Sequence, residues 1–186
     1  MGRPPEPICC ILTVSDRCAA GQTWDTAGPA LVEIVQAELA GSVVAHQIVP
    51  DEGDQIQQVL VDWTRDGRRP DLILTTGGTG LAPRDGTPEA TAPILERRHP
   101  ALLELARLRC FEKTPLTFLT RGEAGTIGQT LIINLPGSKT GASEMLHALV
   151  DVLPHAIHTL RGDAEDCGVL SPQAAPGPLA KRQGRQ

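Results

Sequence analysis

The fold of this chain is decided by residues 72–91, which read LILTTGGTGLAPRDGTPEAT. The apolar run Leu72–Thr75 is typical of a short buried strand, and it leads into a loop rich in glycine and threonine. Thr87-Pro88-Glu89 then predicts a helix start, with a capping hydroxyl, a proline at the first helical position and an acid in the first turn. The stretch therefore predicts a strand, a glycine loop and a helix in immediate succession.

The glycine loop Thr75–Gly80 has two interpretations. Glycines let a backbone approach a ligand closely and point its N–H groups at a bound anion, but they also serve an ordinary tight turn. Three glycines and three threonines among six residues exceed the needs of a turn, which favours a ligand loop. Two common phosphate signatures are excluded. Pro83 occupies the third glycine position of the dinucleotide fingerprint, and Ser138 separates Gly137 from Lys139 where a P-loop needs Gly-Lys.

Strands and helices alternate on both sides of this stretch. The predicted strands cover residues 8–15, 42–49, 72–75 and 130–135. The predicted helices cover residues 29–40, 54–66, 88–96, 100–110, 141–150 and 154–160, and Gly122, Gly125 and Gly128 indicate a small irregular β-hairpin. This alternation predicts an α/β fold of three layers, with an open, mainly parallel sheet and helices on both faces.

The composition fits one folded domain. A chain of 186 residues can bury a core without disulfides. We divide it into a flexible N-terminus (1–7), a domain (8–162) and a disordered tail (163–186) rich in Pro, Gly, Ala and Gln. The net charge of −5 argues against nucleic acids or membrane surfaces as partners. The five cysteines lack C-x-x-C spacing, and no signal peptide or membrane span is evident, so the predicted location is the cytoplasm.

Aromatic residues make up only 2% of the chain, and there is no tyrosine. A site that stacks a base or a pterin on several rings is therefore not expected, although Trp24 or Trp63 could serve singly. Phe111, Phe118 and Trp63 are expected to fill the core.

Each predicted parallel strand ends in polar or glycine-rich sequence. In open α/β sheets, ligands bind beyond the carboxyl ends of the strands, so the loops that follow are expected to converge on one crevice. These loops are Ser15-Asp16-Arg17, Pro50-Asp51-Glu52, Thr75–Gly80 and Asn134–Lys139.

Asp51 and Asp85 are the two acids expected in the middle of that crevice. Asp51 is alternatively a helix cap or turn residue, and Asp85 alternatively pairs with its neighbour Arg84. The residues alone leave these alternatives open. Paired carboxylates beside a phosphate loop suit Mg²⁺, which takes a few carboxylates together with substrate phosphates.

Ser138 and Lys139 precede a helix whose N-terminus is expected to face the crevice, where they would add anion contacts. The alternatives are a helix-start hydroxyl for Ser138 and a solvated side chain for Lys139. The five histidines show neither metal spacing nor a nucleophile partner and are expected to be structural or exposed.

Several ordered motifs resemble those of the molybdopterin adenylyltransferases, a family that includes the G domain of gephyrin and bacterial single-domain counterparts. The resemblance extends from about Ile8 to Arg161. It is carried by the motifs Thr75–Gly80, Arg84-Asp85, Thr87–Thr91, Val49–Glu52 and Asn134–Ser138. It implies transfer of AMP from Mg·ATP to the terminal phosphate of molybdopterin, with release of pyrophosphate.

The resemblance also implies roles for individual residues. Asp51 and Asp85 are implied as catalytic, Mg²⁺-binding acids. Substrate binding is implied for Ser15, Asp16, Thr75, Thr76, Gly77, Gly78, Thr79, Gly80, Arg84, Pro88, Glu89, Asn134, Pro136, Gly137, Ser138 and Lys139. The family is typically trimeric, and the lack of a fused molybdenum-inserting domain implies a separate insertase as product acceptor.

The sequence thus favours an enzyme that makes adenylylated molybdopterin. A non-catalytic molybdopterin-binding or scaffold module is the main alternative, and a nucleotide hydrolase is a weaker one. The presence of both Asp51 and Asp85 favours the enzyme.

Overall fold

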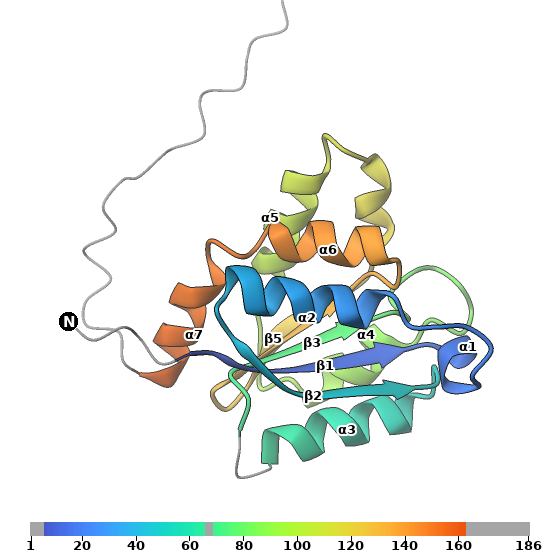
Figure 1. Ribbon diagram of the computed structural model, residues 1–186, viewed down its shortest axis with the longest axis horizontal. Coiled ribbons are helices and arrows are strands. Elements are labelled where there is room, and N and C mark those ends of the chain that lie inside the picture. Colours follow the sequence, from blue (N-terminus) through green and yellow to red (C-terminus); the bar gives the residue numbers. More distant parts are fainter. Residues whose placement is uncertain (1–5, 66–68, 163–186) are drawn as a thin grey trace, which may run out of the picture.

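The computed structural model describes residues 6–65 and 69–162, which form a six-stranded sheet with the order β2-β1-β3-β6-β5-β4 (Figure 1). β1, β2, β3 and β6 are mutually parallel, whereas β5 runs antiparallel to β6 and β4 antiparallel to β5. The strands are β1 (Ile8–Val14), β2 (Ser42–Val49), β3 (Leu72–Thr76), β4 (Arg97–Arg98), β5 (Ala124–Ile127) and β6 (Thr130–Leu135). The predicted open, mainly parallel sheet is confirmed.

The helices lie close to their predicted positions. They are α1 (Asp16–Ala19), α2 (Ala27–Glu38), α3 (Gly53–Arg65), α4 (Thr87–Thr91), α5 (Pro100–Cys110), α6 (Lys139–His147) and α7 (Leu153–Arg161), with 3₁₀ turns at Ala92–Ile94 and Pro115–Leu119. The sequence pattern did not indicate α1 or β4. The predicted β-hairpin is present: β5 and β6 pair antiparallel across a turn at Gly128, and this hairpin extends the main sheet.

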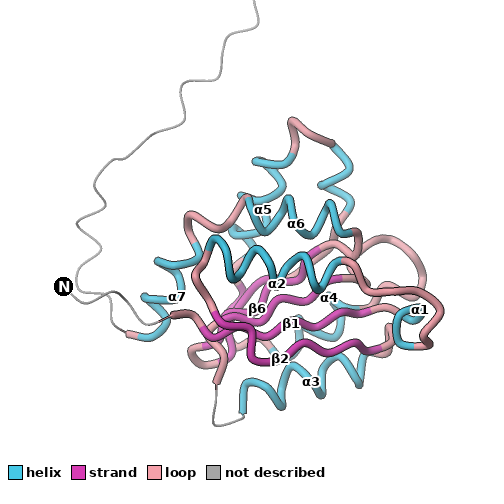
Figure 2. The backbone as a smooth tube through the Cα atoms, in the orientation of Figure 1, coloured by secondary structure: helices cyan, strands magenta, loops and turns pink. Residues whose placement is uncertain are grey.

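Helices lie on both faces of the sheet (Figure 2), and on each face the apolar side chains of strands and helices pack into one core. Side chains alternate between the faces along each strand. On β1, for example, Ile11 packs toward α2 and α6, and Leu12 packs toward α3. The central strands are buried on both sides, which explains why they read as continuous apolar runs. The three-layer arrangement follows from this double burial.

The predicted termini lie outside the described residues, and two predicted core residues lie at the surface. Residues 1–5 and the predicted tail 163–186 lie outside them, so the predicted division of the chain stays a prediction. Phe111 and Phe118 do not fill the core: they are 53% and 51% exposed and contact each other edge to face, with ring centroids 5.8 Å apart. Within residues 6–65 and 69–162, no helix is long and apolar enough to cross a membrane.

Candidate functional site

The loops that follow the four parallel strands meet at the carboxyl edge of the sheet. The Ser15 backbone N–H donates to Val49 O at 2.9 Å, and the Gly77 N–H donates to Leu135 O at 3.2 Å, so the strand ladders continue into the loops. A Cβ added to Gly137 would lie 3.0 Å from Gly77 Cα, which shows how closely the third and fourth loops approach. The predicted convergence on one region is therefore present.

Gly77 and Gly78 have backbone angles that L-residues rarely adopt, with φ values of +105° and +60°. A Cβ on Gly77 would lie 2.0 Å from Val14 O. A Cβ on Gly78 would lie 2.4 Å from Thr87 Oγ1 and 2.6 Å from Asp51 Oδ1. Only glycine fits at these positions, and Gly78 faces one of the two predicted catalytic acids directly.

A buried polar network beneath the glycine loop holds its two ends. Asn134 and Thr75 are neighbours across the β3–β6 pair and are fully buried. Asn134 Nδ2 donates to Thr75 Oγ1 at 3.0 Å and to Thr91 Oγ1 at 3.1 Å. Thr76 Oγ1 donates to Pro136 O at 2.6 Å, which ties the third loop to the fourth. Thr75 and Asn134, implied as substrate contacts, are buried and support the loops from below; their contact with substrate stays a prediction.

The helix α4 begins differently from the sequence prediction. Gly86 is its N-cap, and Thr87 contributes no capping hydrogen bond. The Thr87 hydroxyl instead donates to Gly77 O at 2.9 Å, and the Thr87 N–H donates to Gly78 O at 3.0 Å. Thr87 therefore clamps the glycine loop rather than the helix that follows it.

Arg121 closes the outer side of the glycine loop. Its guanidinium donates to Gly80 O at 2.7 Å and to Asp85 O at 2.8 Å, and it also pairs with Glu89. These contacts hold the backbone that carries Asp85 against the end of the glycine loop. Glu89, which was implied as a substrate contact, forms an ion pair with Arg121 and remains exposed, and its contact with substrate stays a prediction.

Asp51 and Asp16 join the loops after β2 and β1 through reciprocal hydrogen bonds. The Asp16 N–H donates to Asp51 Oδ2 at 3.2 Å, and the Asp51 N–H donates to Asp16 Oδ1 at 3.0 Å. Arg84 donates to both Asp16 carboxylate oxygens at 2.7 and 3.1 Å and to Glu52 Oε1 at 2.8 Å. Asp51 is thus not a cap of α3, and Arg84 connects three loops.

The electrostatics distinguish the two acids in this pair. The hydrogen bonds from Arg84 hold the pKa of Asp16 below its usual value. Burial raises the pKa of Asp51, and the neighbouring charges of Asp16 and Asp85 act in the same direction. Asp51 Oδ1 is buried and has no hydrogen-bond partner. The fold therefore holds at Asp51 a carboxylate oxygen that a cation or a donor group would stabilise.

Asp85 lies at the far end of the glycine loop. Its Oδ2 accepts from the Ala82 N–H at 2.9 Å and lies 2.8 Å from the position of a Cβ added to Gly80. The alternative pairing with Arg84 is wrong, because the Arg84 guanidinium is directed at Asp16 and Glu52. Both predicted acids therefore face the glycine loop, Asp51 at Gly78 and Asp85 at Gly80.

Two hollows open on either side of this loop. The α6 hollow, of about 630 Å³, lies between the glycine loop, the 115–119 turn and α6, and Leu81, Leu116 and Met145 contribute to its lining. The α1 hollow, of about 620 Å³, lies between the ends of β1 and β3, α1 and the start of α2. Gly78, Asp85, Gly137 and Ser138 border both hollows. A ligand in one hollow would therefore meet a ligand in the other at these residues.

Thirteen of the eighteen predicted site residues line one or both hollows. They are Ser15, Asp16, Asp51, Thr76, Gly77, Gly78, Thr79, Gly80, Arg84, Asp85, Pro136, Gly137 and Ser138. The other five, Thr75, Pro88, Glu89, Asn134 and Lys139, line neither. Lys139 is exposed, as its alternative interpretation expected, whereas Ser138 both caps α6 and borders the hollows.

Apart from Trp24, which the sequence allowed as a single stacking ring, the segment between α1 and α2 was not predicted to contribute to the site. Thr23, Trp24, Asp25 and Thr26 line the α1 hollow, and Thr13 lies at its base. The available signal was the sequence QTWDTAG, in which a tryptophan stands alone among polar residues. In the α6 hollow, Leu116, Thr117 and Leu119 were missed because the 115–119 turn carries no periodic pattern.

The residues present fit a Mg²⁺ ion held jointly with a ligand. Among the described residues, no three His, Cys, Asp or Glu side chains are grouped to hold a metal by themselves. The site offers instead the unpartnered oxygen of Asp51, with Asp85 nearby. Mg²⁺ is commonly held by one or two carboxylates plus substrate phosphates, so this donor set suits it.

Comparison with known proteins gives consistent matches over the domain. Residues 10–155 match a family model described as a probable molybdopterin binding domain. The chain is 44% identical over 153 residues to the Drosophila melanogaster molybdenum cofactor synthesis protein cinnamon, covering 82% of this chain and 25% of that protein. It is 36% identical over 154 residues to a Helicobacter pylori molybdopterin adenylyltransferase, covering 82% of this chain and 87% of that protein.

Solved structures agree. The molybdopterin biosynthesis enzyme MoaB of Thermus thermophilus superposes with a TM-score of 0.79 at 50% identity, over 84% of this chain and 97% of that one. A MogA structure gives a TM-score of 0.77 at 38% identity, over 82% of this chain and 99% of that one. The chain spans 25% of the length of the Drosophila protein and 22% of that of gephyrin from Dictyostelium discoideum, but 87% of that of the Helicobacter pylori protein.

Proposed function

Because the chain belongs to the family of probable molybdopterin binding domains, we propose that it is a molybdopterin adenylyltransferase. It transfers AMP from ATP to the terminal phosphate of molybdopterin and releases pyrophosphate. The Helicobacter pylori and Escherichia coli relatives carry this name, at 36% and 34% identity. The observation that carries the proposal is the unpartnered, buried Asp51 carboxylate oxygen beside Gly78, where the two hollows meet.

The reaction needs two ligands that meet. A phosphate oxygen of molybdopterin attacks the α-phosphorus of ATP, and the bond between that phosphorus and the oxygen leading to the β-phosphate breaks. Such a transfer depends on positioning and on charge neutralisation more than on covalent help from the protein. Two hollows that share the border formed by Gly78, Asp85, Gly137 and Ser138 suit that requirement.

We place the triphosphate at the acidic end of the α1 hollow, where Asp51 and Asp85 would hold the Mg²⁺ that accompanies it. When bound, Mg²⁺ offsets the charge of the phosphate oxygens and helps pyrophosphate to leave. The chain itself holds the acids in place. Asp16 and Asp51 are joined by reciprocal hydrogen bonds, Arg84 binds Asp16, and Arg121 holds the backbone of Asp85. The N-terminus of α6, capped by Ser138, offers partial positive charge to the molybdopterin phosphate.

The α6 hollow is left for the pterin. Its lining includes the hydroxyls of Thr114, Thr117 and Thr120 and the apolar side chains of Leu116 and Leu119. A ring system with polar edges and apolar faces is compatible with this mixed lining.

We also propose a homotrimer and a separate insertase as the recipient of the product. Support for self-association is an exposed apolar cluster, made of Leu108, Phe111, Leu116, Phe118 and Leu119, whose members are 51% to 67% exposed. Exposed apolar side chains gathered on one surface commonly mark an interface. Light scattering of the purified protein tests this proposal, and a monomeric mass contradicts it.

The test of the reaction is a molybdopterin-dependent assay. Purified protein is incubated with molybdopterin and Mg·ATP, and adenylylated molybdopterin is measured by mass together with pyrophosphate. Equal amounts of both products are expected, with Asp51→Asn and Asp85→Asn reducing them by about 10²–10³-fold. Molybdopterin binding without product would instead indicate a binding module. Nucleotide breakdown that ignores molybdopterin would indicate a hydrolase.

A further inference from the structure

Trp24 is a large aromatic side chain that the fold leaves in solvent. It is 90% exposed and lines the α1 hollow, between α1 and α2. The chain contains two tryptophans, two phenylalanines and no tyrosine. Among the described residues that line the α1 and α6 hollows, Trp24 is the only aromatic one. A flat ligand group entering the α1 hollow therefore has one protein ring available to stack on.

Hydrogen bonds of the next residue, Asp25, fix the backbone at Trp24. Asp25 Oδ1 accepts from the N–H groups of Ala27 and Gly28 at 3.0 and 2.9 Å. Asp25 Oδ2 accepts from Thr13 Oγ1 at 2.6 Å and lies 3.0 Å from His46 Nε2. The Asp25 side chain is only 6% exposed. The hydrogen bonds of Asp25 thus fix the backbone next to Trp24, while the indole ring itself stays exposed. Such preorganisation lowers the entropy lost when a ligand binds.

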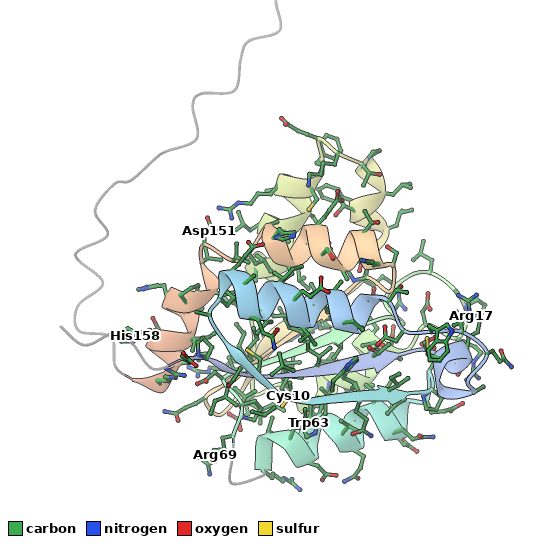
Figure 3. The ribbon with its side chains drawn as sticks, viewed as in Figure 1. Cys10, Arg17, Trp63, Arg69, Asp151 and His158 are labelled. Carbon is green, nitrogen blue, oxygen red and sulfur yellow. The ribbon has the colours of Figure 1, made fainter. Side chains whose placement is uncertain are left out.

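The same hollow is also lined by charged groups. Asp16, Asp51, Arg84 and Asp85 lie there, and the proposed function places the triphosphate among them. Figure 3 shows Arg17 on α1, which also lines this hollow, whereas Trp63 lies on α3, on the other face of the sheet from α2. A nucleotide with its phosphates at these acids would have its base in the hollow that the segment containing Trp24 also lines.

We propose that Trp24 stacks on the nucleobase of the nucleoside triphosphate. The proposal rests on the proposed function, since it assigns the base end of that substrate's site. Stacking on an aromatic ring recognises the π face that every base has, so Trp24 supplies affinity for the base and does not by itself distinguish adenine from guanine. A single exposed apolar residue is ordinary on protein surfaces. The position of Trp24 in a charged hollow, on an anchored backbone, distinguishes it from that background.

The test compares a ligand that has a base with one that lacks it. Affinities for Mg·ATP and for Mg·tripolyphosphate are measured by calorimetry on wild type, Trp24→Ala and Trp24→Phe. Trp24→Ala is expected to weaken Mg·ATP binding about tenfold and to leave Mg·tripolyphosphate binding unchanged. Trp24→Phe is expected to retain most of the affinity. In the assay of adenylylated molybdopterin, Trp24→Ala should raise KM for ATP and leave kcat nearly unchanged.

The second tryptophan provides the control. Trp63 packs partly buried against the core on the α3 side and lines neither hollow. Trp63→Phe should therefore leave ATP affinity unaltered, and it leaves Trp24 as the sole tryptophan, so that quenching of fluorescence by Mg·ATP reports directly on Trp24. Melting curves of each variant verify that the fold is intact.

Two results would overturn the inference. One is equal ATP affinity in wild type and Trp24→Ala; the other is an equal loss for ATP and tripolyphosphate, which would mean that the segment collapsed. Either result leaves the proposed function standing if wild type still makes adenylylated molybdopterin. Failure of wild type to bind ATP at all would overturn both the inference and the proposed function.

Discussion

Replacement of Gly78 by alanine tests how the glycine loop and Asp51 depend on each other. Gly78 has φ +60°, and a Cβ there would lie 2.4 Å from Thr87 Oγ1 and 2.6 Å from Asp51 Oδ1. Neither contact is tolerable, so both side chains must move. The movement breaks the Thr87 hydrogen bond to Gly77 O and turns the Asp51 carboxylate away from the border of the two hollows.

The expected magnitude combines two terms. The left-handed backbone costs alanine about 1–2 kcal/mol, and the lost Thr87 hydrogen bond costs about 0.5–1.5 kcal/mol. The free energy of unfolding should therefore fall by about 1.5–3.5 kcal/mol, which lowers Tm by about 3–14 °C for a domain of this size. Turnover should fall much further, by about 10²-fold, because a displaced acid removes an electrostatic contact of the transition state.

Gly128→Ala is the matched control. Gly128 has φ +55°, nearly the same as Gly78, but a Cβ there would meet no atom within 4 Å. It lies in the turn between β5 and β6 and lines neither hollow. It should therefore show the backbone cost alone, with full turnover and unchanged ligand affinity.

Melting curves, calorimetric titration with molybdopterin and Mg·ATP, and turnover per folded molecule are measured on both variants. Weaker ligand binding is expected only for Gly78→Ala. If both variants lose the same stability and bind ligands as wild type does, the glycine serves the turn alone, and the assignment of this loop to ligand binding is refuted.

Three further substitutions address the surround of the site. Asp51→Asn should remove most turnover yet raise Tm at pH 7, because burial disfavours the charged carboxylate. Since burial raises the pKa of Asp51 in the folded state, the gain in Tm should shrink as the pH falls through that pKa and vanish below the ordinary Asp value of 3.8. Melting curves across pH check this, and a lower Tm at pH 7 contradicts it. Asn134→Ala should lower the free energy of unfolding by about 2–4 kcal/mol, measured in urea, because two buried threonine hydroxyls lose their donor. Arg121→Lys should reduce turnover more than stability, because an ammonium group cannot reproduce the planar fork that reaches Gly80 O and Asp85 O; steady-state kinetics beside melting curves would show equal losses if the arginine were only structural.

The architecture was predictable because its signals are local. The apolar runs of β1, β3 and β6 and the polar sequence after each of them are visible in the chain, and parallel strands bring their carboxyl ends together by geometry. The two-residue strand β4 was not predictable, since Arg97 and Arg98 carry no strand pattern and are ordered only by pairing with β5.

The roles of single side chains at the site were less predictable, because partners far apart in sequence decide them. Arg84 appeared to be a neighbour for Asp85, but it reaches Asp16 instead. The sequence predicted that the Thr87 hydroxyl caps α4, but the hydroxyl donates a hydrogen bond to Gly77 O instead. Asn134 resembled a ligand contact, and only the register of β6 beside β3 shows that it is sealed beneath the loop.

The position of β6 between β3 and β5 also has a consequence for folding kinetics. The glycine loop leaves β3 early in the chain, but the loop that completes the hollows follows β6, which pairs with β3 only after a long intervening segment is complete. Contacts between strands so distant in sequence form slowly, because the connecting chain must first lose its freedom. A growing chain would thus expose Gly77 and Gly78 well before β6 and α6 could close around a ligand. Substrates bind only the finished arrangement, so they should raise the measured Tm and slow unfolding while leaving the rate of folding unchanged.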